Sequence, residues 1–433
     1  MKSLIFSIVL LLSFIKFVSS ECLDFPKFDS NEFSVTKCGG LKEFTTEDFV
    51  VDSTTKIKIN NNKPKPGMCN TGGKVNMFEI DFSCDGNTSN ATCEKAKSSF
   101  ETAGMIISSA LKLKRKIKVN AVFTKFCGVF LDCGGKPGPL GYGRPDRFIQ
   151  LKDKDGVVRL YPQALVKQFD SVDHPEYNKY DITANFNSES TAFWFSGDPN
   201  PPTSEQVDFR IVIVHEFIHG LGLLTQWADY FNPTTIALTP FPSFLRNNGT
   251  ITFTGFQETV FDKHLVFTNN NNINNPEKYL TSVREKINTF AGGPKANTKF
   301  DNSSSFTASF VNSSNYNYAK NLLTKAITSG TIGFLPHNAK NNNDILLIET
   351  SLNPFLSGSN LNHLDNNTYA NTRDFAMRWR FQRGVTLETL YIANGGDKSN
   401  SCVIGPNTIK ILETIGYQTI NYRKNKKFQS VKF

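Results

Sequence analysis

The chain has 433 residues, of which 39% are hydrophobic and 20% are charged, and its formal net charge at pH 7 is +9. Beyond its first residues, no stretch approaches the roughly 20 consecutive apolar residues of a membrane-spanning helix, so no transmembrane segment is expected. The positive excess is modest and is densest in the tail Arg423–Lys427. This pattern is typical of a solvated terminus, and nucleic acid is not an expected partner.

The first 20 residues have the pattern of an export signal. Lys2 precedes an apolar run that ends at Val18, and two serines suited to signal-peptidase cleavage stand before Glu21. Residues 1–20 are therefore predicted to be a signal peptide. The mature chain is expected to be a secreted monomer, located outside the cell or in the endolysosomal lumen.

The cysteines and the glycosylation sequons agree with export. The eight cysteines are even in number and are expected to pair fully as disulfides, although the sequence leaves the pairing open. Seven of them lie before residue 134. Six N-x-S/T sequons predict glycosylation at Asn87, Asn90, Asn248, Asn302, Asn312 and Asn366.

The residue composition of the N-terminal third changes near Asn76. Residues 21–75 form a cysteine-containing segment broken by asparagines and prolines, which indicates loops or a pro-segment that is removed. After Asn76 an amphipathic helix is predicted over residues 94–113. Strands are predicted over residues 77–82, 117–123, 147–151, 180–186 and 191–195. The order of strand, helix and strand favours a sheet covered by helices.

A long apolar helix is predicted next. Thr203 and Ser204 are good N-cap residues, and apolar residues then run densely over 209–224. Residues 229–346 contain asparagine tracts typical of exposed loops and are interpreted as an insertion. The last segment, residues 347–433, includes a predicted helix over 407–415 that is stopped by Gly416.

The apolar helix contains an H-E-x-x-H motif formed by His215, Glu216 and His219. Side chains four residues apart share one face of a helix, so the two imidazoles can bind one zinc ion. The Glu216 carboxylate can take a proton from zinc-bound water without binding the metal. The alternative is two ordinary histidines beside a helical glutamate. The spacing favours one Zn²⁺ per chain and hydrolytic chemistry.

A catalytic zinc site needs a third protein ligand and an open position for water. Gly222 occupies the glycine of the pattern H-E-x-x-H-x-x-G-x-x-H, but Thr225 stands where the last histidine would be. A hydroxyl is a poor zinc ligand, so the third donor must come from elsewhere. Glu258 would give a gluzincin-type site, in which a second helix supplies a glutamate. The remaining histidines are His174, His264, His337 and His363.

The segment around His363 resembles the leishmanolysin-like branch of the metzincin zinc metalloproteases. In that branch an inserted region separates the glycine from the third zinc histidine, and a Met-turn follows it. Here His363 lies in a loop of small residues, and Met377 follows. The similarity, which includes secreted and bacterial relatives, extends to residues 181–188, 194–197, 208–209 and 404–406. It covers most of the chain from Asn76, apart from much of the insertion.

The resemblance implies an α+β fold with a metzincin-like two-lobed catalytic domain. A twisted sheet and the active-site helix would form the N-terminal lobe, residues 76–228. The insertion would span residues 229–346, and a mostly irregular or helical C-terminal lobe would span residues 347–433. His215, His219 and His363 would hold zinc, and Met377 would lie beneath the zinc as a hydrophobic floor.

The expected function is that of a secreted zinc-dependent endopeptidase acting on proteins or peptides. The rival from another class is a catalytically silent secreted or cell-surface adhesion glycoprotein that keeps the same fold. The intact Glu216 argues against this rival, because a binding module has no need of a general base there. Trp194 and Trp227 are expected in the core. The strand over 180–186 is expected to be a sheet edge on which an extended peptide could pair.

Overall fold

The computed structural model describes residues 75–127, 139–169, 177–231, 236–247, 249–270, 272–396 and 403–420, with the backbone of 21–24 and 34–37. The predicted signal peptide, most of segment 21–75 and the basic tail lie outside the described residues. The described residues form helices and several small sheets in which most strand pairs are antiparallel, so the α+β class is confirmed. None of the described helices combines the length and the apolar content that crossing a membrane would require.

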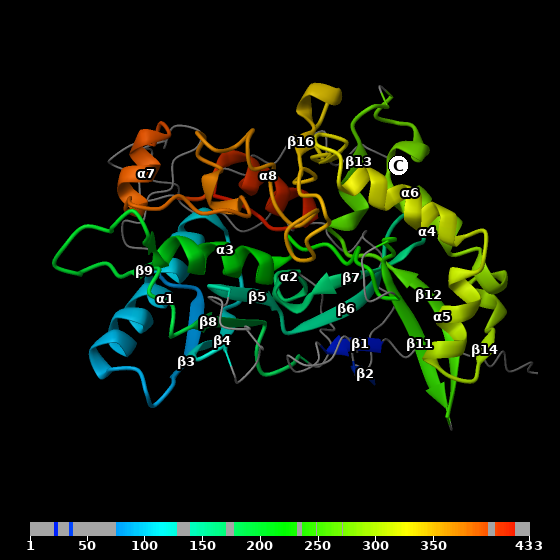
Figure 1. Ribbon diagram of the computed structural model, residues 1–433, viewed down its shortest axis with the longest axis horizontal. Coiled ribbons are helices and arrows are strands. Elements are labelled where there is room, and N and C mark those ends of the chain that lie inside the picture. Colours follow the sequence, from blue (N-terminus) through cyan, green and yellow to red (C-terminus); the bar gives the residue numbers. More distant parts are fainter. Residues whose placement is uncertain are drawn as a thin grey trace, which may run out of the picture.

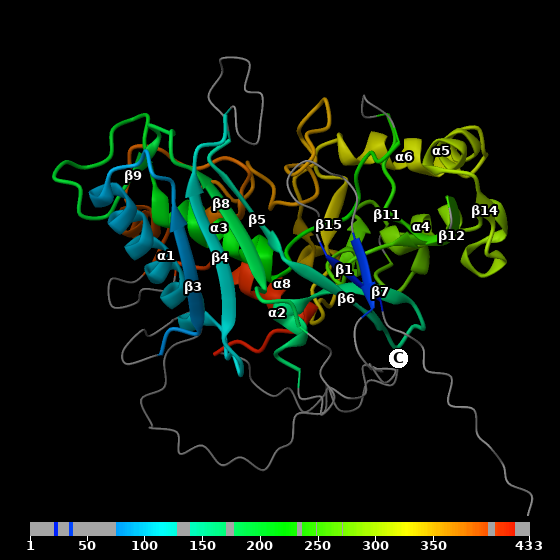
Figure 2. The ribbon, with the colours of Figure 1, turned by 90° about the horizontal axis from the view of Figure 1, so that it is seen from below.

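A four-stranded sheet in the order β3–β4–β8–β5 forms one layer of the molecule (Figures 1 and 2). The strands β3 (Phe78–Cys84), β4 (Ile117–Thr124) and β8 (Ile182–Asn187) are parallel, and β5 (Gly141–Pro145) is antiparallel to β8. Parallel neighbours need a crossover, and α1 (Asn90–Ala110) provides it between β3 and β4. These elements agree with the predicted strand, helix and strand.

The expectation that residues 180–186 form the sheet edge is wrong. The strand β8 lies between β4 and β5, and β5 is the last strand of the sheet. The sequence of β5, Gly141-Tyr142-Gly143-Arg144-Pro145, contains two glycines and a proline, which are depleted in strands. The sequence pattern therefore gave no signal for this edge strand.

The helix α3 (Phe209–Leu221) packs against α1, β5 and β8, and all its residues are buried. A helix that is apolar on every side is expected inside the protein. Its N-cap is Asp208, whose side chain accepts a hydrogen bond from the Arg210 N–H at 3.0 Å. The predicted caps Thr203 and Ser204 are therefore wrong, because the short strands β9 (Phe193–Trp194) and β10 (Val207–Asp208) pair first.

A second four-stranded sheet runs in the order β2–β1–β6–β7. It contains β1 (Glu21–Asp24), β2 (Ser34–Lys37), β6 (Arg147–Lys152) and β7 (Val158–Pro162), and the short helix α2 (Gln163–Val166) follows β7. Because β1 pairs antiparallel with β6, part of segment 21–75 is built into this sheet and is not a loop.

The interpretation of residues 229–346 as loops is wrong for most of their length. They contain the sheet β11 (Phe241–Asn247), β12 (Thr250–Gln257) and β14 (Lys299–Phe300), and a second sheet of β13 (Leu265–Phe267), β15 (Ile332–Phe334) and β16 (Leu346–Leu347). Helices α4 (Leu280–Ile287), α5 (Ser303–Val311) and α6 (Tyr316–Ala326) complete the region. Its 3-10 turns are η2 (Asp262–His264), η3 (Pro276–Lys278), η4 (Phe290–Gly292), η5 (Pro294–Ala296) and η6 (Asn342–Asp344).

A cluster of aromatic side chains explains why this region folds. Phe253, Phe256, Phe290, Phe306 and Phe310 are buried, and their rings contact one another at centroid distances of 5.0–6.4 Å. Aromatic side chains bury large apolar areas, so a few of them can form a core. The asparagine tracts lie outside the elements that carry these rings and hide this pattern in the sequence.

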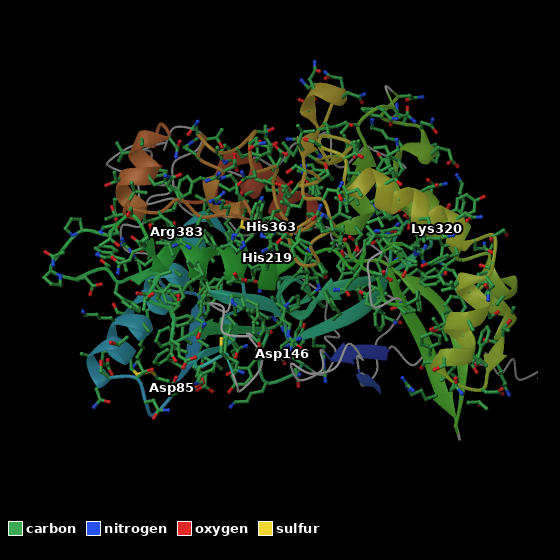
Figure 3. All side chains as sticks on the ribbon, viewed as in Figure 1. Asp85, Asp146, His219, Lys320, His363 and Arg383 are labelled. Atoms are coloured by element: carbon green, nitrogen blue, oxygen red, sulfur yellow. A yellow bond between two sulfur atoms is a disulfide. The ribbon has the colours of Figure 1, made fainter. Side chains whose placement is uncertain are left out.

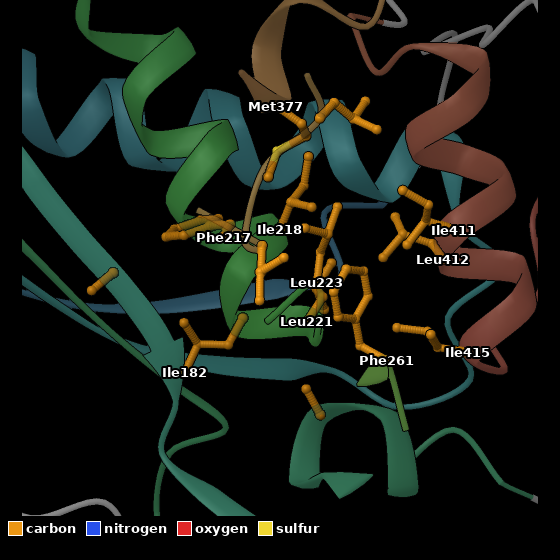
Figure 4. Packing of buried hydrophobic residues seen from close by; sticks show 14 of the residues in the cluster. Ile182, Phe217, Ile218, Leu221, Leu223, Phe261, Met377, Ile411, Leu412 and Ile415 are labelled. Atoms are coloured by element: carbon orange, nitrogen blue, oxygen red, sulfur yellow. The ribbon is translucent and has the colours of Figure 1, made fainter. Parts of the chain in front are cut away.

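The C-terminal segment contains η7 (Phe375–Met377), α7 (Leu387–Ala393) and α8 (Pro406–Ile415). The helix α8 ends before Gly416 as predicted, with Gly416 at φ 128°. Figures 1 and 2 show α7 and α8 on the side of α3 that faces away from the sheet. In Figure 4 the α8 side chains Ile411 and Leu412 face Leu223, and Met377 lies beside Ile218 of α3.

Three other predictions can be compared with the described residues. Cys84 and Cys93 form a disulfide, and no described cysteine is free. Trp194 and Trp227 are 8% and 2% exposed, which confirms that they lie in the core. Asn248 lies outside the described residues; Asn366 is half-buried, and the exposed sequon asparagines are Asn87, Asn90, Asn302 and Asn312.

Candidate metal centre

Three histidines from two distant parts of the chain meet at one point. His215 and His219 project from α3, and His363 comes from the loop before η7 (Figure 3). Their Nε2 atoms lie 3.0 Å apart for His215 and His219, 3.0 Å for His215 and His363, and 3.2 Å for His219 and His363. All three side chains are buried. The structure thus brings together the three histidines that the resemblance implies.

Each imidazole is oriented by a backbone carbonyl on its far side. The Nδ1 atom of His215 lies 2.6 Å from Ala376 O, that of His219 lies 2.7 Å from Leu223 O, and that of His363 lies 2.9 Å from Ser359 O. A carbonyl only accepts, so Nδ1 carries the proton in each ring. The Nε2 lone pairs then point at one another, an arrangement typical of histidine metal ligands.

Three facing lone pairs repel one another unless a cation lies between them. None of the Nε2 atoms can donate a hydrogen bond to another in this tautomer. Burial disfavours a bound proton: it lowers the pKa of His219 to about 4 and that of His363 to about 3, and the pKa of His215 lies well below its usual value. Tetrahedral Zn²⁺ with Zn–N bonds of about 2.0–2.1 Å requires nitrogens about 3.3 Å apart. The three histidines therefore fit a zinc ion.

Glu216 follows His215 on α3 and is 7% exposed. Burial raises the pKa of its carboxyl to about 8, and a hydrogen bond from the Gly143 N–H opposes this shift. Gly143 belongs to β5, and a Cβ atom at this position would lie 2.2 Å from the Glu216 carbonyl oxygen. Only glycine therefore lets the edge strand approach the helix closely enough to reach the carboxylate.

The turn at Gly222 explains the glycine of the motif. Gly222 has φ 118°, and the bonds Gly222 N–H to His219 O (2.9 Å) and Leu223 N–H to Ile218 O (3.3 Å) end α3 in a Schellman pattern. This turn ends the helix earlier than the predicted residue 224. It also brings the Leu223 carbonyl back to His219, so the glycine helps to orient a candidate ligand.

The loop that carries His363 is held from both sides. The Glu349 N–H donates to the His363 carbonyl at 2.8 Å, and the Leu364 N–H donates to the Met377 carbonyl at 2.9 Å. Leu361 has φ 65°, a conformation that costs energy for a branched side chain. Thr225, the residue in place of the expected histidine, donates its N–H to Asn362 Oδ1 at 2.9 Å. Thr225 thus stabilises the loop that carries His363.

The other candidate ligands lie elsewhere. Glu258 is fully buried, but its carboxylate accepts from Arg159 Nε at 2.8 Å and from Thr281, so the gluzincin-type ligand is wrong. Among the described residues, His264 and His337 belong to no metal-ligand cluster. His174 lies outside the described residues.

Two features of the site gave no signal in the sequence. The ring of Phe381 lies 4.9 Å from the ring of His215, centroid to centroid, in an edge-on contact. Arg210 forms bidentate pairs with Asp208 (3.0 and 2.6 Å) and with Glu388 (2.6 and 2.8 Å), which tie the start of α3 to α7. The contacts with Phe381 and Glu388 join α3 to a segment about 170 residues later in the chain. In the sequence, the close spacing of Asp208 and Arg210 could have suggested only the ion pair between those two residues.

The fold and the site define an α+β protein with a buried three-histidine centre beside a buried glutamate. The chain belongs to the SPBPB7E8-like family, whose model matches residues 22–431. It is 28% identical over 371 residues to "Uncharacterized protein PB7E8.01" of Schizosaccharomyces pombe. The aligned region covers 80% of this chain and 63% of that protein. The chain thus spans less than two thirds of this relative's length. No solved structure matches the chain.

Proposed function

We propose that this protein is a zinc-dependent endopeptidase that hydrolyses peptide bonds of protein or peptide substrates. The observation that carries the proposal is the convergence of three Nε2 atoms within 3.2 Å, with the intact Glu216 on the same helix. His215, His219 and His363 would hold one Zn²⁺ per chain. A protein that only needs a structural zinc site has no use for an adjacent carboxylate of this kind.

When bound, Zn²⁺ would supply a Lewis acid that polarises the scissile carbonyl and lowers the pKa of a water molecule. Glu216 takes a proton from the attacking water and passes it to the leaving amine. The Gly143 N–H fixes one oxygen of the Glu216 carboxylate, so that the base keeps its direction between the two proton transfers. The carbonyls of Ala376, Leu223 and Ser359 keep the three imidazoles in the tautomer that exposes Nε2.

The free edge of the sheet suggests where a substrate would lie. The strand β5 pairs on one side with β8, and no described strand pairs with its other side. An extended peptide can add to such an edge through main-chain hydrogen bonds. Because β5 also contacts Glu216 through Gly143, a peptide on this edge would have a backbone carbonyl close to the three histidines.

A metzincin-like architecture of the leishmanolysin-like branch is the finer part of the proposal. Three features support it: the glycine turn after the second histidine, the third histidine from a distant loop, and the turn containing Met377. Met377 is fully buried, and the residue before it supplies the carbonyl that orients His215. The leader at residues 1–20 and the sequons support a secreted, glycosylated enzyme, and a monomer stays part of the proposal.

The proposal is tested by Glu216→Gln, a nearly isosteric change that removes the base. Wild type should cleave casein or gelatin, and Glu216→Gln should lose at least about a thousandfold of that activity. Zinc content, measured by mass spectrometry of the metal, should stay near one per chain. The exposed Glu101 of α1 provides the control, and Glu101→Gln should keep full activity.

Two results would overturn the proposal. Wild-type protein that binds zinc but cleaves no member of a broad peptide library would favour the adhesion glycoprotein. Wild-type protein that cleaves peptides equally well after complete removal of zinc would exclude the metal mechanism.

A further inference from the structure

A compact group of cations lies between α1 and β4, at the end of the sheet where β4 begins. Within residues 112–118, which we call the basic turn, five of the seven residues are cationic, and all five are exposed: Lys112, Lys114, Arg115, Lys116 and Lys118. The two apolar residues of the turn face inward, since Ile117 is fully buried and Leu113 packs against the core. The turn therefore presents positive charge without an apolar surface.

The backbone of the basic turn is held in place by side chains from the segment after α2. The Gln168 side chain accepts from the N–H groups of Lys114 (2.9 Å) and Arg115 (3.2 Å) and donates to the Arg115 carbonyl at 3.2 Å. Lys167 donates through Nζ to the Lys116 carbonyl at 2.8 Å. Gln168 is buried, so its bonds to the turn are partly shielded from water. The cations are thus displayed from a fixed loop.

Most of this charge has no partner in the described part of the chain. Lys112, Arg115, Lys116 and Lys118 form no ion pair among the described residues. The nearby Asp181 is buried and is bound by Lys167 at 2.7 Å. Among the residues that the structure describes, Glu79, which is in register with Lys118 on the neighbouring strand β3, is an exposed negative charge at this edge.

The last described residues pair with the end of α1, just before the basic turn. Leu111 forms an antiparallel bridge with Thr419, and Ile420 N–H donates to Ala110 O at 3.0 Å. The basic turn itself carries five positive charges, more than half of the formal net charge of the whole chain, +9.

We propose that the basic turn binds an extended acidic polysaccharide that carries sulfate or carboxylate groups. Lys and Arg side chains fixed on a rigid loop match a linear array of anionic groups, and such complementarity speeds encounter as well as binding. The turn has no exposed apolar side chain to insert into a membrane and no aromatic ring on which a base could stack. The choice of a polysaccharide rests on the export predicted by residues 1–20.

The test uses the full-length mature chain and heparin as the probe. The variant Lys112→Gln/Arg115→Gln/Lys116→Gln/Lys118→Gln removes four charges and leaves the backbone bonds of Gln168 and Lys167 intact. The control Lys97→Gln/Lys295→Gln/Lys325→Gln/Lys340→Gln removes the same number of charges from exposed lysines elsewhere. We expect the basic-turn variant to elute from heparin-agarose at lower NaCl, with a Kd at 0.15 M NaCl raised about tenfold or more, while the control stays close to wild type.

Several outcomes would overturn the proposal. Equal losses in the basic-turn variant and in the control would show that net charge alone is responsible. No change in either would exclude the basic turn. Tight binding to phosphatidylserine vesicles or to single-stranded DNA, without binding to heparin, would assign the surface to a different partner. Circular dichroism of both variants checks that the fold is kept, and casein cleavage should be unchanged, so this result is independent of the peptidase proposal.

Discussion

The Nδ1 atom of His215 lies 2.6 Å from the carbonyl oxygen of Ala376, which is 161 residues later in the chain. The first atom belongs to the helix α3, and the second belongs to the turn that contains Met377. The carbonyl fixes the imidazole tautomer, and the same turn pairs with the segment after His363 through Leu364 and Met377. One short turn therefore positions two of the three candidate ligands, and the site depends on the docking of the C-terminal segment onto α3.

We expect His363→Ala to abolish tight zinc binding. Two histidines on one helix leave only two protein donors, and a catalytic zinc site requires three. The zinc stoichiometry should fall from one to well below one per chain in a buffer with a weak chelator. Equilibrium dialysis followed by metal analysis measures this change.

His264→Ala and Glu258→Gln are the matched controls for the third ligand. Both residues lie outside the three-histidine cluster, so folded protein of either variant should bind zinc as wild type does. Unchanged zinc binding in His363→Ala, together with a loss in either control, would refute the assignment of His363.

Gly222→Ala should destabilise the protein and weaken the zinc site. A Cβ at this position would lie 2.7 Å from Pro162 Cγ, and the backbone has φ 118°. The left-handed conformation alone costs about 1–2 kcal/mol for alanine, and the clash adds to this cost. Because the turn delivers the Leu223 carbonyl to His219, zinc affinity should fall together with the midpoint of denaturant unfolding.

Gly330→Ala separates the two contributions. Gly330 also has a positive φ, 74°, but a Cβ there meets nothing within 4 Å. The stability of this control should fall only by the cost of the left-handed conformation, and its zinc affinity should stay the same. Equal stability losses in the two variants would show that the contact with Pro162 does not matter.

Arg210→Met should cost about 3 kcal/mol of unfolding free energy, because it leaves the fully buried Asp208 carboxylate without its cation. The partner Glu388 has a side chain that is 65% exposed, so Glu388→Gln should cost less than about 1 kcal/mol. Urea denaturation of both variants measures the difference. If the two variants were equally stable, the buried part of this network would not hold α3 to the C-terminal segment.

The stability of the protein should depend on pH through Asp262. This fully buried carboxyl has its pKa raised from 3.8 to about 7, mainly by burial, although Thr225 and two N–H groups donate to it. Glu258 also raises this pKa through its negative charge. Because the folded pKa exceeds the unfolded one, the contribution to stability is complete below about pH 4 and is lost as the pH rises through about 7.

Asp262→Asn tests this dependence, since the amide is neutral at every pH and can still accept from the two N–H groups. At pH 8 the variant should be more stable than wild type by roughly 1–3 kcal/mol, and the difference should shrink toward pH 4. Denaturant unfolding at several pH values measures it. The same change at the exposed Asp301 should leave the curve unaltered. A stability gain of Asp262→Asn over wild type that grows toward low pH would contradict this prediction.

Local signals were sufficient for much of the N-terminal fold. Alternating apolar residues predicted β4, because burial on one face leaves a period in the sequence. The dense apolar run predicted α3, because burial on all faces leaves a continuous apolar stretch. They failed for β5, which has glycines and a proline, and for residues 229–346, where asparagine-rich turns separate the buried phenylalanines. In both cases packing against other elements compensates for a weak local preference.

By itself the sequence determined the candidate chemistry: H-E-x-x-H spacing places His215, Glu216 and His219 on one helix, and the helical repeat is a local property. Tertiary structure alone decided which distant residue joins them, because His363 and Glu258 are both buried and both chemically able to bind zinc. The Glu258 carboxylate is paired with Arg159, whereas the His363 Nε2 faces the two helical imidazoles. Contacts between segments 144 residues apart leave no period in the sequence. Residue patterns therefore left both residues open, the family resemblance favoured His363, and the folded chain distinguishes the two by geometry.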